Sequence, residues 1–214
     1  MPAPNPLTFL LNSLRTQIFH PPSPPTQPFT GQTIIVTGSN TGLGLAAIQH
    51  FVALDAARII LTSRDLRKGE AALARVEKAT RKSDIVEVWQ LDLSSTKSVK
   101  AFAERVEREL DRVDVLVENA GSATEVFRRV GDEVMEGSGE GTETILAVNV
   151  IGTFLLAMLL VRKLGKTRDF TGVPAKLCVV TSDLHFLTEL PQREAENVLE
   201  VLNEEKSVPS MFDR

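Results

Sequence analysis

Tyrosine is absent from the 214 residues, and the chain contains a single cysteine and a single tryptophan. One cysteine excludes an internal disulfide, and because Cys178 lies in an apolar run we expect a buried and inert thiol. A chain without disulfides is compatible with a reducing compartment, and we expect a cytoplasmic protein. The missing tyrosine removes the phenol side chain from the possible acids and bases.

An excess of one charge is also lacking, since 24 lysines and arginines stand against 28 aspartates and glutamates. Interspersed charges of both signs give no reason to expect nucleic acid or an anionic membrane as a partner. The three histidines are scattered and lie beside no cysteine or acid cluster, so we expect no metal site. His185 follows Ser182, but no Gly-x-Ser-x-Gly motif surrounds that serine, which argues against a hydrolase.

The first 29 residues contain no hydrophobic run long enough for a membrane span. Leu7 to Ile18 carries leucines at helical spacing, but it is short and lacks the features of a signal peptide. Prolines between Pro21 and Pro25 predict an extended, stiff linker. We expect residues 1–29 to form a helical arm and a Pro-rich linker, with the helix packed on the domain. Contact with a membrane surface is the less favoured alternative.

Apolar stretches of strand length alternate with helical patterns from residue 30 onward. The predicted strands are Ile34–Val36, Ala57–Thr62, Ile85–Leu91, Val113–Val117 and Ala175–Thr181. They recur in units of roughly thirty residues, which is typical of βαβ crossovers in a parallel sheet. Asp65 and Ser95 are suited to cap the helices that follow them. We therefore expect residues 30–214 to form one α/β domain on a doubly wound parallel sheet.

Three further segments complete the predicted domain. Residues 122–141 are polar and rich in glycine and glutamate, which predicts a loose insertion. Thr142 to Leu164 is apolar around most of its circumference and predicts a long, buried helix. Arg193 to Asn203 predicts a final helix with a solvated, glutamate-rich face.

The stretch from Thr33 to Leu45 combines a buried strand, a glycine-rich turn and the start of a helix. Gly38, Gly42 and Gly44 lack a Cβ, so the turn can be sharp and a pyrophosphate can approach the backbone N–H groups. The first turn of a helix also stabilises an anion. The pattern favours a dinucleotide-binding loop, and an ordinary glycine-rich turn is the alternative.

Polar residues follow the next three predicted strands. Arg64 and Lys68 come after the second strand, where an arginine can bind a ribose 2′-phosphate; otherwise they are solvated surface cations. Asp92 follows the third strand and can accept from an adenine amino group or cap a helix. Asn119 begins an Asn-Ala-Gly sequence after the fourth strand, where small residues leave room for a cofactor or form a turn.

Together these residues resemble the classical short-chain dehydrogenase/reductases. The resemblance rests on Thr37-Gly-Ser-Asn-Thr-Gly-Leu-Gly44, Asp92, Asn119-Ala-Gly121, Asn149 and Ser182, in that order and spacing. Ser63-Arg-Asp65 is most similar to the retinol-dehydrogenase-like branch, whose fungal-type members often serve small-molecule biosynthesis. The resemblance covers about residues 30 to 190. It implies a Rossmann fold, NADP as cofactor and reversible hydride transfer between a ketone and an alcohol.

The resemblance also implies a role for each matching residue. The pyrophosphate would be surrounded by the loop residues Gly38, Asn40, Gly42, Leu43 and Gly44. Arg64 and Lys68 would meet the ribose phosphate. The adenine would meet Asp92, and the ribose on the nicotinamide side would meet Asn119. Ser182 would hydrogen-bond the substrate oxygen, and Asn149 would anchor a water in the proton relay.

The sequence departs from the family pattern in two places. Glu118 stands where the family usually has the first of two asparagines. The family's proton donor is the tyrosine of a Tyr-x-x-x-Lys motif after Ser182, whose lysine lowers the pKa of the tyrosine, and this chain has no tyrosine. The chain ends at Arg214, about where that motif would stand, so we expect a domain of about five strands that is truncated before it.

The second departure has consequences for activity and assembly. Without the catalytic tyrosine and lysine we expect an impaired enzyme, and the alternative is a non-catalytic nucleotide-binding or interaction fragment. The fifth strand would form an apolar edge of the sheet, because the helix that covers it in the family would be missing. The family's usual dimer also uses that helix, so no oligomeric state is predicted.

Overall fold

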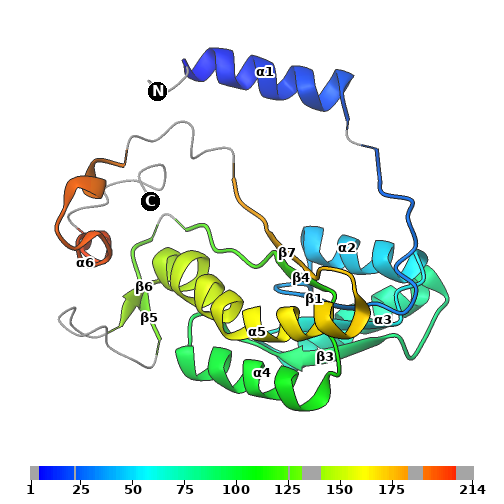
Figure 1. Ribbon diagram of the computed structural model, residues 1–214. Coiled ribbons are helices and arrows are strands. Elements are labelled where there is room, and N and C mark those ends of the chain that lie inside the picture. Colours follow the sequence, from blue (N-terminus) through cyan, green and yellow to red (C-terminus); the bar gives the residue numbers. More distant parts are fainter. Residues whose placement is uncertain (1–4, 22, 125, 132–140, 183–189, 206–214) are drawn as a thin grey trace.

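The computed structural model describes residues 5–21, 23–124, 126–131, 141–182 and 190–205. Its centre is a five-stranded parallel sheet in the order β3-β2-β1-β4-β7 (Figure 1). The strands are β1 (Thr33–Val36), β2 (Arg58–Ser63), β3 (Val86–Gln90), β4 (Val115–Glu118) and β7 (Lys176–Val179). The predicted doubly wound α/β fold is confirmed.

Helices cover both faces of this sheet (Figure 1). The helices α2 (Gly42–Ala53) and α3 (Leu66–Thr80) lie on one face, and α4 (Thr96–Glu109) and α5 (Thr153–Thr171) lie on the other. Along β1, Ile34 and Val36 join the core cluster beneath α2 and α3, whereas Ile35 joins the cluster beneath α4 and α5. Because both faces are covered, every residue of β1 is buried.

Both predicted helix caps are confirmed. Asp65 Oδ1 accepts a hydrogen bond from the backbone N–H of Arg67 at 2.9 Å, at the start of α3. Ser95 Oγ accepts one from the N–H of Ser98 at 3.2 Å, at the start of α4. Each cap satisfies an N–H group that has no partner within its own helix.

The predicted helix Thr142–Leu164 begins and ends later than expected. Its first residues form β6 (Thr142–Glu143), which pairs antiparallel with β5 (Arg129–Val130). The Glu143 carboxylate accepts a hydrogen bond from the Leu146 N–H at 2.9 Å, so the helix starts behind it. A π-helical turn, η1 (Leu146–Gly152), precedes α5. Residues 132–140 of the predicted insertion lie outside the described residues.

The helical stretch Leu146–Thr171 is long and apolar enough to cross a membrane by length and composition alone. Leu156, Leu160 and Leu164 nevertheless belong to the core cluster between α4 and the sheet. The apolar pattern therefore serves burial against the sheet on this side of the helix.

The predicted helix Arg193–Asn203 is interrupted. A single 3-10 turn, η3 (Pro191–Glu194), is followed by extended backbone at Ala195. The short helix α6 (Val198–Leu202) then begins behind Asn197, whose side chain accepts from the Glu200 N–H at 3.2 Å. Because Asn197 caps a new helix, the single predicted helix becomes two short elements.

Strand β7 forms one edge of the sheet, and all its residues are exposed. The prediction that Cys178 is buried is therefore wrong, because its strand carries no covering layer among the described residues. Leu177 and Val179 on the same strand are 46% and 38% exposed. These side chains confirm the expectation of an apolar sheet edge.

The N-terminal arm is helical, as predicted, but it does not pack on the domain. The helix α1 (Pro6–Phe19) stands away from the sheet in Figure 1, and its leucines Leu7, Leu10, Leu11 and Leu14 are exposed. The linker is what contacts the domain. Its Pro25 carbonyl lies 3.0 Å from His50 Nε2, and the Phe29 ring packs edge-on against Phe51 with centroids 4.9 Å apart.

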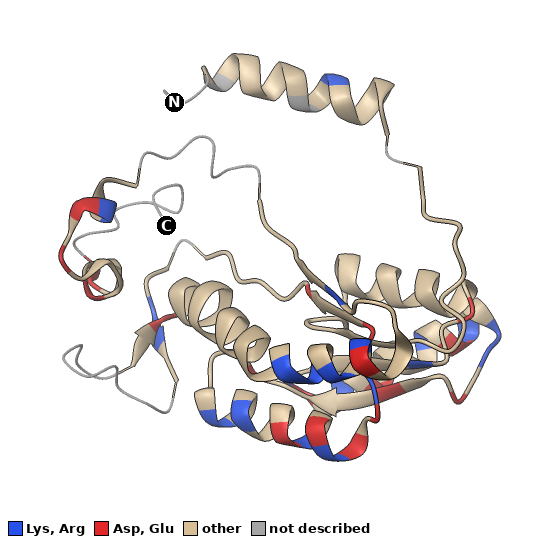
Figure 2. Ribbon diagram, viewed as in Figure 1, with Lys and Arg blue, Asp and Glu red and all other residues tan. Residues whose placement is uncertain are grey.

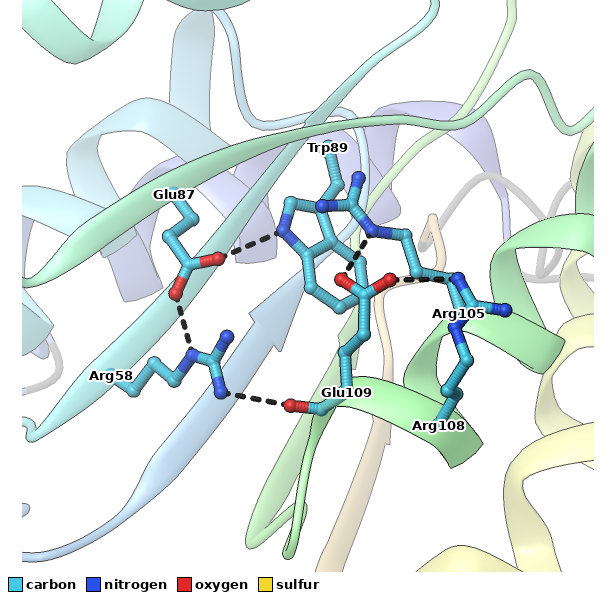
Figure 3. A network of polar contacts seen from close by, with 6 residues as sticks. All are labelled: Arg58, Glu87, Trp89, Arg105, Arg108 and Glu109. Atoms are coloured by element: carbon cyan, nitrogen blue, oxygen red, sulfur yellow. Dashed lines mark hydrogen bonds and ion pairs between the residues drawn. The ribbon is translucent and has the colours of Figure 1, made fainter.

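Many residues of α4 and of the second half of α5 are charged, whereas charged residues are sparse on α1 and α2 (Figure 2). At the β3 edge they surround a buried tryptophan, Trp89 (Figure 3). The indole N–H donates to Glu87 Oε2 at 3.1 Å, and the Arg105 guanidinium lies 3.8 Å from the centre of the indole ring. Phe102 of α4 completes the contact with an edge-on ring. Trp89 therefore joins β3 to α4 through polar and apolar contacts at once.

The carboxylates on either side of Trp89 are themselves paired. Arg58 Nε donates to Glu87 Oε1 at 2.6 Å, and this bond holds the pKa of Glu87 below its usual value. Glu109 accepts from Arg105 at 2.8 Å and from Arg108 at 2.7 Å. The network links β2, β3 and α4 at the sheet edge opposite β7 (Figure 3).

We expect Trp89→Ala to lower the free energy of unfolding by about 3–5 kcal/mol, because it leaves a cavity between β3 and α4. Trp89→Phe keeps the ring contacts and loses only the indole N–H bond, so it should cost less. Urea unfolding followed by circular dichroism measures both. An equal loss of unfolding free energy in the two variants would contradict the conclusion that the ring contacts are the main link between β3 and α4.

Candidate functional site

The carboxyl ends of the strands face one cleft at the point where the sheet changes direction. From the central strand β1, the chain adds β2 and β3 on one side and β4 and β7 on the other. Loops leaving β1 and β4 therefore diverge in opposite directions and leave a crevice between them. Ligands of open α/β sheets bind at such a point.

The loop after β1 is shaped by Gly38, which has a φ of +59°. A Cβ at this position would lie 2.8 Å from the Cα of Ala120 in the loop after β4. Glycine is therefore required both by the backbone conformation and by the close approach of the second loop. Ser39 connects the same loop to the ends of β1 and β2. Its Oγ donates to the Val36 carbonyl at 2.7 Å and accepts from the Thr62 N–H at 3.0 Å.

Thr37 and Asn119 lock the two loops to each other. Thr37 Oγ1 accepts from the N–H groups of Asn119 and Ala120, both at 2.9 Å. In return, Asn119 Nδ2 donates to the Thr37 carbonyl at 2.9 Å. Gly44 lies directly below, where a Cβ would be 2.6 Å from Asn119 Nδ2. The structure thus gives Asn119 a bracing contact, and the sequence pattern alone did not indicate a role for Thr37.

The cleft between these loops has a volume of about 520 Å³. Of the predicted cofactor residues, those that line it are Gly38, Asn40, Leu43, Arg64, Lys68, Asp92 and Asn119. Gly42 and Gly44 shape the loop without being among the lining residues: Gly42 has a φ of +56°, and Gly44 is buried beneath Asn119. Residues that follow four strands, together with residues of α2 and α3, therefore converge on one space.

Two exposed cations, Arg64 and Lys68, are among the residues that line the cleft. Arg64 follows β2 directly, and Gln90 of β3 donates to its backbone carbonyl at 3.2 Å. Within the described part of the chain, neither cation forms an ion pair with a carboxylate. Both charges therefore remain available to an anionic group in the cleft.

Asp92 lines the cleft and also shapes the turn before α4. Its Oδ1 accepts from the N–H of Ser94 at 2.9 Å and from the Ser94 hydroxyl at 2.7 Å. The cap of α4 itself is Ser95, not Asp92. Asp92 therefore both lines the cleft and holds this turn, and its contact with the adenine stays a prediction.

Asn149 lies on the π-helical turn η1 and faces the loop after β4. Its Oδ1 accepts from the Ser122 N–H at 2.7 Å, and its Nδ2 donates to the Ser122 carbonyl at 2.9 Å. Gly152, three positions later, packs directly on the backbone of Leu93, so a side chain there would collide with it. Asn149 therefore connects η1 to Ser122, which lines the cleft.

Ser182 follows β7 and is exposed. It is not among the residues that line the cleft, so the structure does not bring it together with the cofactor residues. Among the described residues, no group of histidine, cysteine, aspartate or glutamate side chains could hold a metal ion.

Glu118, at the end of β4, is an unusual acid, with 1% of its surface exposed. Burial raises the pKa of its carboxyl to about 8, although the hydrogen bond from Thr37 works in the opposite direction. Its Oε1 has no hydrogen-bond partner among the described residues. The sequence marked this position as a departure, but only the structure shows that the carboxyl is enclosed.

We expect Gly44→Ala to lower the free energy of unfolding by about 1–3 kcal/mol, because the added methyl collides with Asn119 and the loop backbone. The matched control is Gly165→Ala on α5, where a Cβ meets no atom within 4 Å. That variant should instead gain up to about 1 kcal/mol from helix propensity. Urea unfolding distinguishes the two, and changes of the same sign would contradict the packing at Gly44.

Comparison with known proteins places this geometry in a family. The family model described as short chain dehydrogenase matches residues 32–173. The chain is 36% identical over 203 residues to the short chain dehydrogenase/reductase dmxR8 of Cryptosporiopsis sp., covering 94% of this chain and 60% of that protein. It is 40% identical over 185 residues to the short chain dehydrogenase atnD of Emericella nidulans, covering 85% of this chain and 55% of that protein. The chain thus spans about half to three fifths of these relatives.

Solved structures agree on the fold. A metagenomic short-chain oxidoreductase in complex with NADP is 26% identical, with a TM-score of 0.55 over 72% of this chain and 63% of that one. The Pseudomonas aeruginosa RhlG/NADP active-site complex has a TM-score of 0.59 over 89% of this chain and 66% of that one, at 19% identity. With its parallel Rossmann-type sheet and its glycine-rich loop, this chain belongs to the short-chain dehydrogenase/reductase family.

Proposed function

We propose that the cleft binds NADP and that the chain supplies the cofactor-binding part of a short-chain oxidoreductase. The observation that carries the proposal is the pair of cations, Arg64 and Lys68, which line the same cleft as the glycine loop and form no ion pair with any described carboxylate. A 2′-phosphate distinguishes NADP from NAD, and an arginine can bind it with paired, charge-assisted hydrogen bonds. The NADP complex of the metagenomic relative supports the same cofactor.

The loop residues fit the rest of the cofactor. Thr41, at the start of α2, makes no side-chain cap, so the first N–H groups of this helix stay open to a pyrophosphate. Gly42 has open space where a Cβ would stand, so a phosphate can approach the backbone closely. Asp92 would meet the adenine, and Asn119, held by Thr37, would border the ribose on the nicotinamide side.

The proposed reaction is hydride transfer between the cofactor and a small ketone or alcohol. When bound, the nicotinamide supplies or accepts the hydride. Ser182 would hydrogen-bond the substrate oxygen, and Asn149 holds the backbone of Ser122 beside the cleft. Because the chain has no tyrosine, no phenol is present to protonate the developing alkoxide, a contribution worth roughly 10²–10⁴-fold in rate. We therefore propose that these 214 residues bind the cofactor but turn over poorly.

A second candidate is a non-catalytic nucleotide-binding or interaction fragment. The lack of tyrosine and the exposed apolar side chains of β7 favour it. The two candidates share cofactor binding and differ in turnover, so the two measurements below separate them.

We expect calorimetry to show tighter binding of NADPH than of NADH, with Arg64→Ala reducing this preference about ten- to a hundredfold through loss of a charge-assisted contact. Arg67→Ala is the matched control, because Arg67 lies three residues further along, on α3, has a side chain that is 95% exposed and does not line the cleft. Absence of NADPH binding to a chain that circular dichroism shows to be folded would refute the proposed site.

We expect these 214 residues to reduce simple ketones slowly, roughly 10²–10⁴-fold below the rate that a general acid would give, because that acid is missing. Absorbance at saturating NADPH measures the rate, with NADPH without protein and Ser182→Ala as the comparisons. A slow rate that depends on Ser182 supports the impaired enzyme, whereas a rate equal to that of NADPH without protein contradicts it and favours the non-catalytic binding fragment.

A further inference from the structure

Glu118 occupies a central place that the proposed function does not use. It ends β4, which lies between β1 and β7, and Asn119, Ala120 and Gly121 directly after it line the cleft. Its backbone carbonyl accepts from the Val180 N–H at 2.9 Å, which holds β7 in place. Leu116, two residues earlier, points into the cluster beneath α4 and α5, so the Glu118 side chain faces the same layer.

The hydrogen bonds of Glu118 lead to the cofactor loop. Thr37 Oγ1 already accepts from the N–H groups of Asn119 and Ala120, so its own hydrogen is directed at Glu118 Oε2, 3.5 Å away. Among the described residues, Oε1 has no partner. One long bond is little compensation for a buried negative charge, whereas a neutral carboxyl tolerates this environment.

Among the described residues, no cation contributes to the pKa of Glu118. Strand β1 and the turn η1 contain no charged residue. Lys176 of β7 lies in register with Val115, at the far end of β4 from Glu118. On α5, Lys163 and Lys166 contact Glu107 of α4, and the remaining charged side chains are Arg162, Arg168 and Asp169. In the described part of the chain, only burial and Thr37 set the pKa of Glu118.

We propose that Glu118 is a positioning residue whose neutral carboxyl lets the end of β4 stay buried against Thr37, and that its ionisation loosens the loop, because the charge draws the end of β4 toward water. This inference rests on the proposed function, because the ligand of the loop is the proposed NADP. A carboxylate at this position gains water only if the end of β4 moves. That movement would carry Asn119 and Ala120 away from Thr37 and open the lock between the two loops.

The pH direction follows from proton linkage. The pKa of Glu118 is about 8 in the folded chain and 4.5 as a free side chain, so the folded state keeps a proton that the unfolded state loses. The stabilising effect of this proton is complete below pH 4.5 and is lost as the pH rises toward 8. Affinity for the cofactor depends only on the protonation state of Glu118 in the folded chain. If only the protonated form holds the loop, affinity falls up to about tenfold per pH unit above that pKa.

Calorimetric titration of NADPH between pH 6 and pH 9 tests the proposal on wild type and Glu118→Gln. Glutamine mimics the neutral acid and cannot ionise, so the variant should bind like wild type at pH 6 and about tenfold more tightly than wild type at pH 9. Titration of the cofactor phosphate affects both proteins equally, so it cancels when the dissociation constants of wild type and Glu118→Gln are compared at the same pH. Glu87→Gln, on β3 away from the loop, should keep the wild-type pH profile. Identical profiles for wild type and Glu118→Gln would overturn the proposal.

Amide hydrogen exchange without cofactor gives a second readout that does not need binding. Protection of segments 33–45 and 115–122 should fall between pH 7 and pH 9 in wild type but not in Glu118→Gln, with segment 99–106 of α4 as the internal reference. If neither protein binds NADPH at any pH, the proposed function fails, and exchange alone decides the role of Glu118. If Glu118→Gln does not fold, the wild-type exchange profile still decides, and unchanged protection of 115–122 relative to 99–106 would overturn the proposal.

Discussion

The hydroxyl of Thr37 joins the two halves of this domain. It accepts from two successive N–H groups of the loop after β4, while the Asn119 amide reaches back to the Thr37 carbonyl. The glycine loop can face a ligand only because its far side is held in this way, with Gly38 and Gly44 admitting the second loop at contact distance. These contacts are hydrogen bonds between neutral groups, and a longer bond of 3.5 Å leads from Thr37 to Glu118, an acid that is itself buried.

The sheet could be predicted because each strand is a short apolar run between helical patterns, and a parallel sheet buried on both faces requires such runs. Glu143 and Asn197 show why the later elements were less predictable. Each uses a side chain to start a helix at a place that apolar periodicity does not mark. Cys178 was placed wrongly for a related reason: an apolar sequence indicates burial only when another layer covers the strand, and cover is a property of the whole fold.

Much of the candidate site could be predicted as residue positions, since Arg64, Lys68, Asp92 and Asn119 follow strand ends that a parallel sheet brings to one edge. The contacts that these side chains make could not be predicted in the same way. Asn149 reaches Ser122 through a π-helical turn, which has no sequence signature of its own. The state of Glu118 depends on what surrounds its carboxyl in three dimensions, so a sequence can mark the position as unusual without giving its pKa.

The two residues that connect the loops, Thr37 and Asn119, lie far apart in the sequence, and this separation affects folding. Strands β1, β2 and β3 are neighbours both in the chain and in the sheet, whereas Thr37 and Asn119 are 82 positions apart. Closing so long a loop costs chain entropy before any of its contacts can repay it. During synthesis from the N-terminus, the first half of the sheet can assemble while the glycine loop still lacks its support. The complete cleft therefore requires β4 to have joined the sheet, and a ligand that binds it stabilises chains in which this has happened.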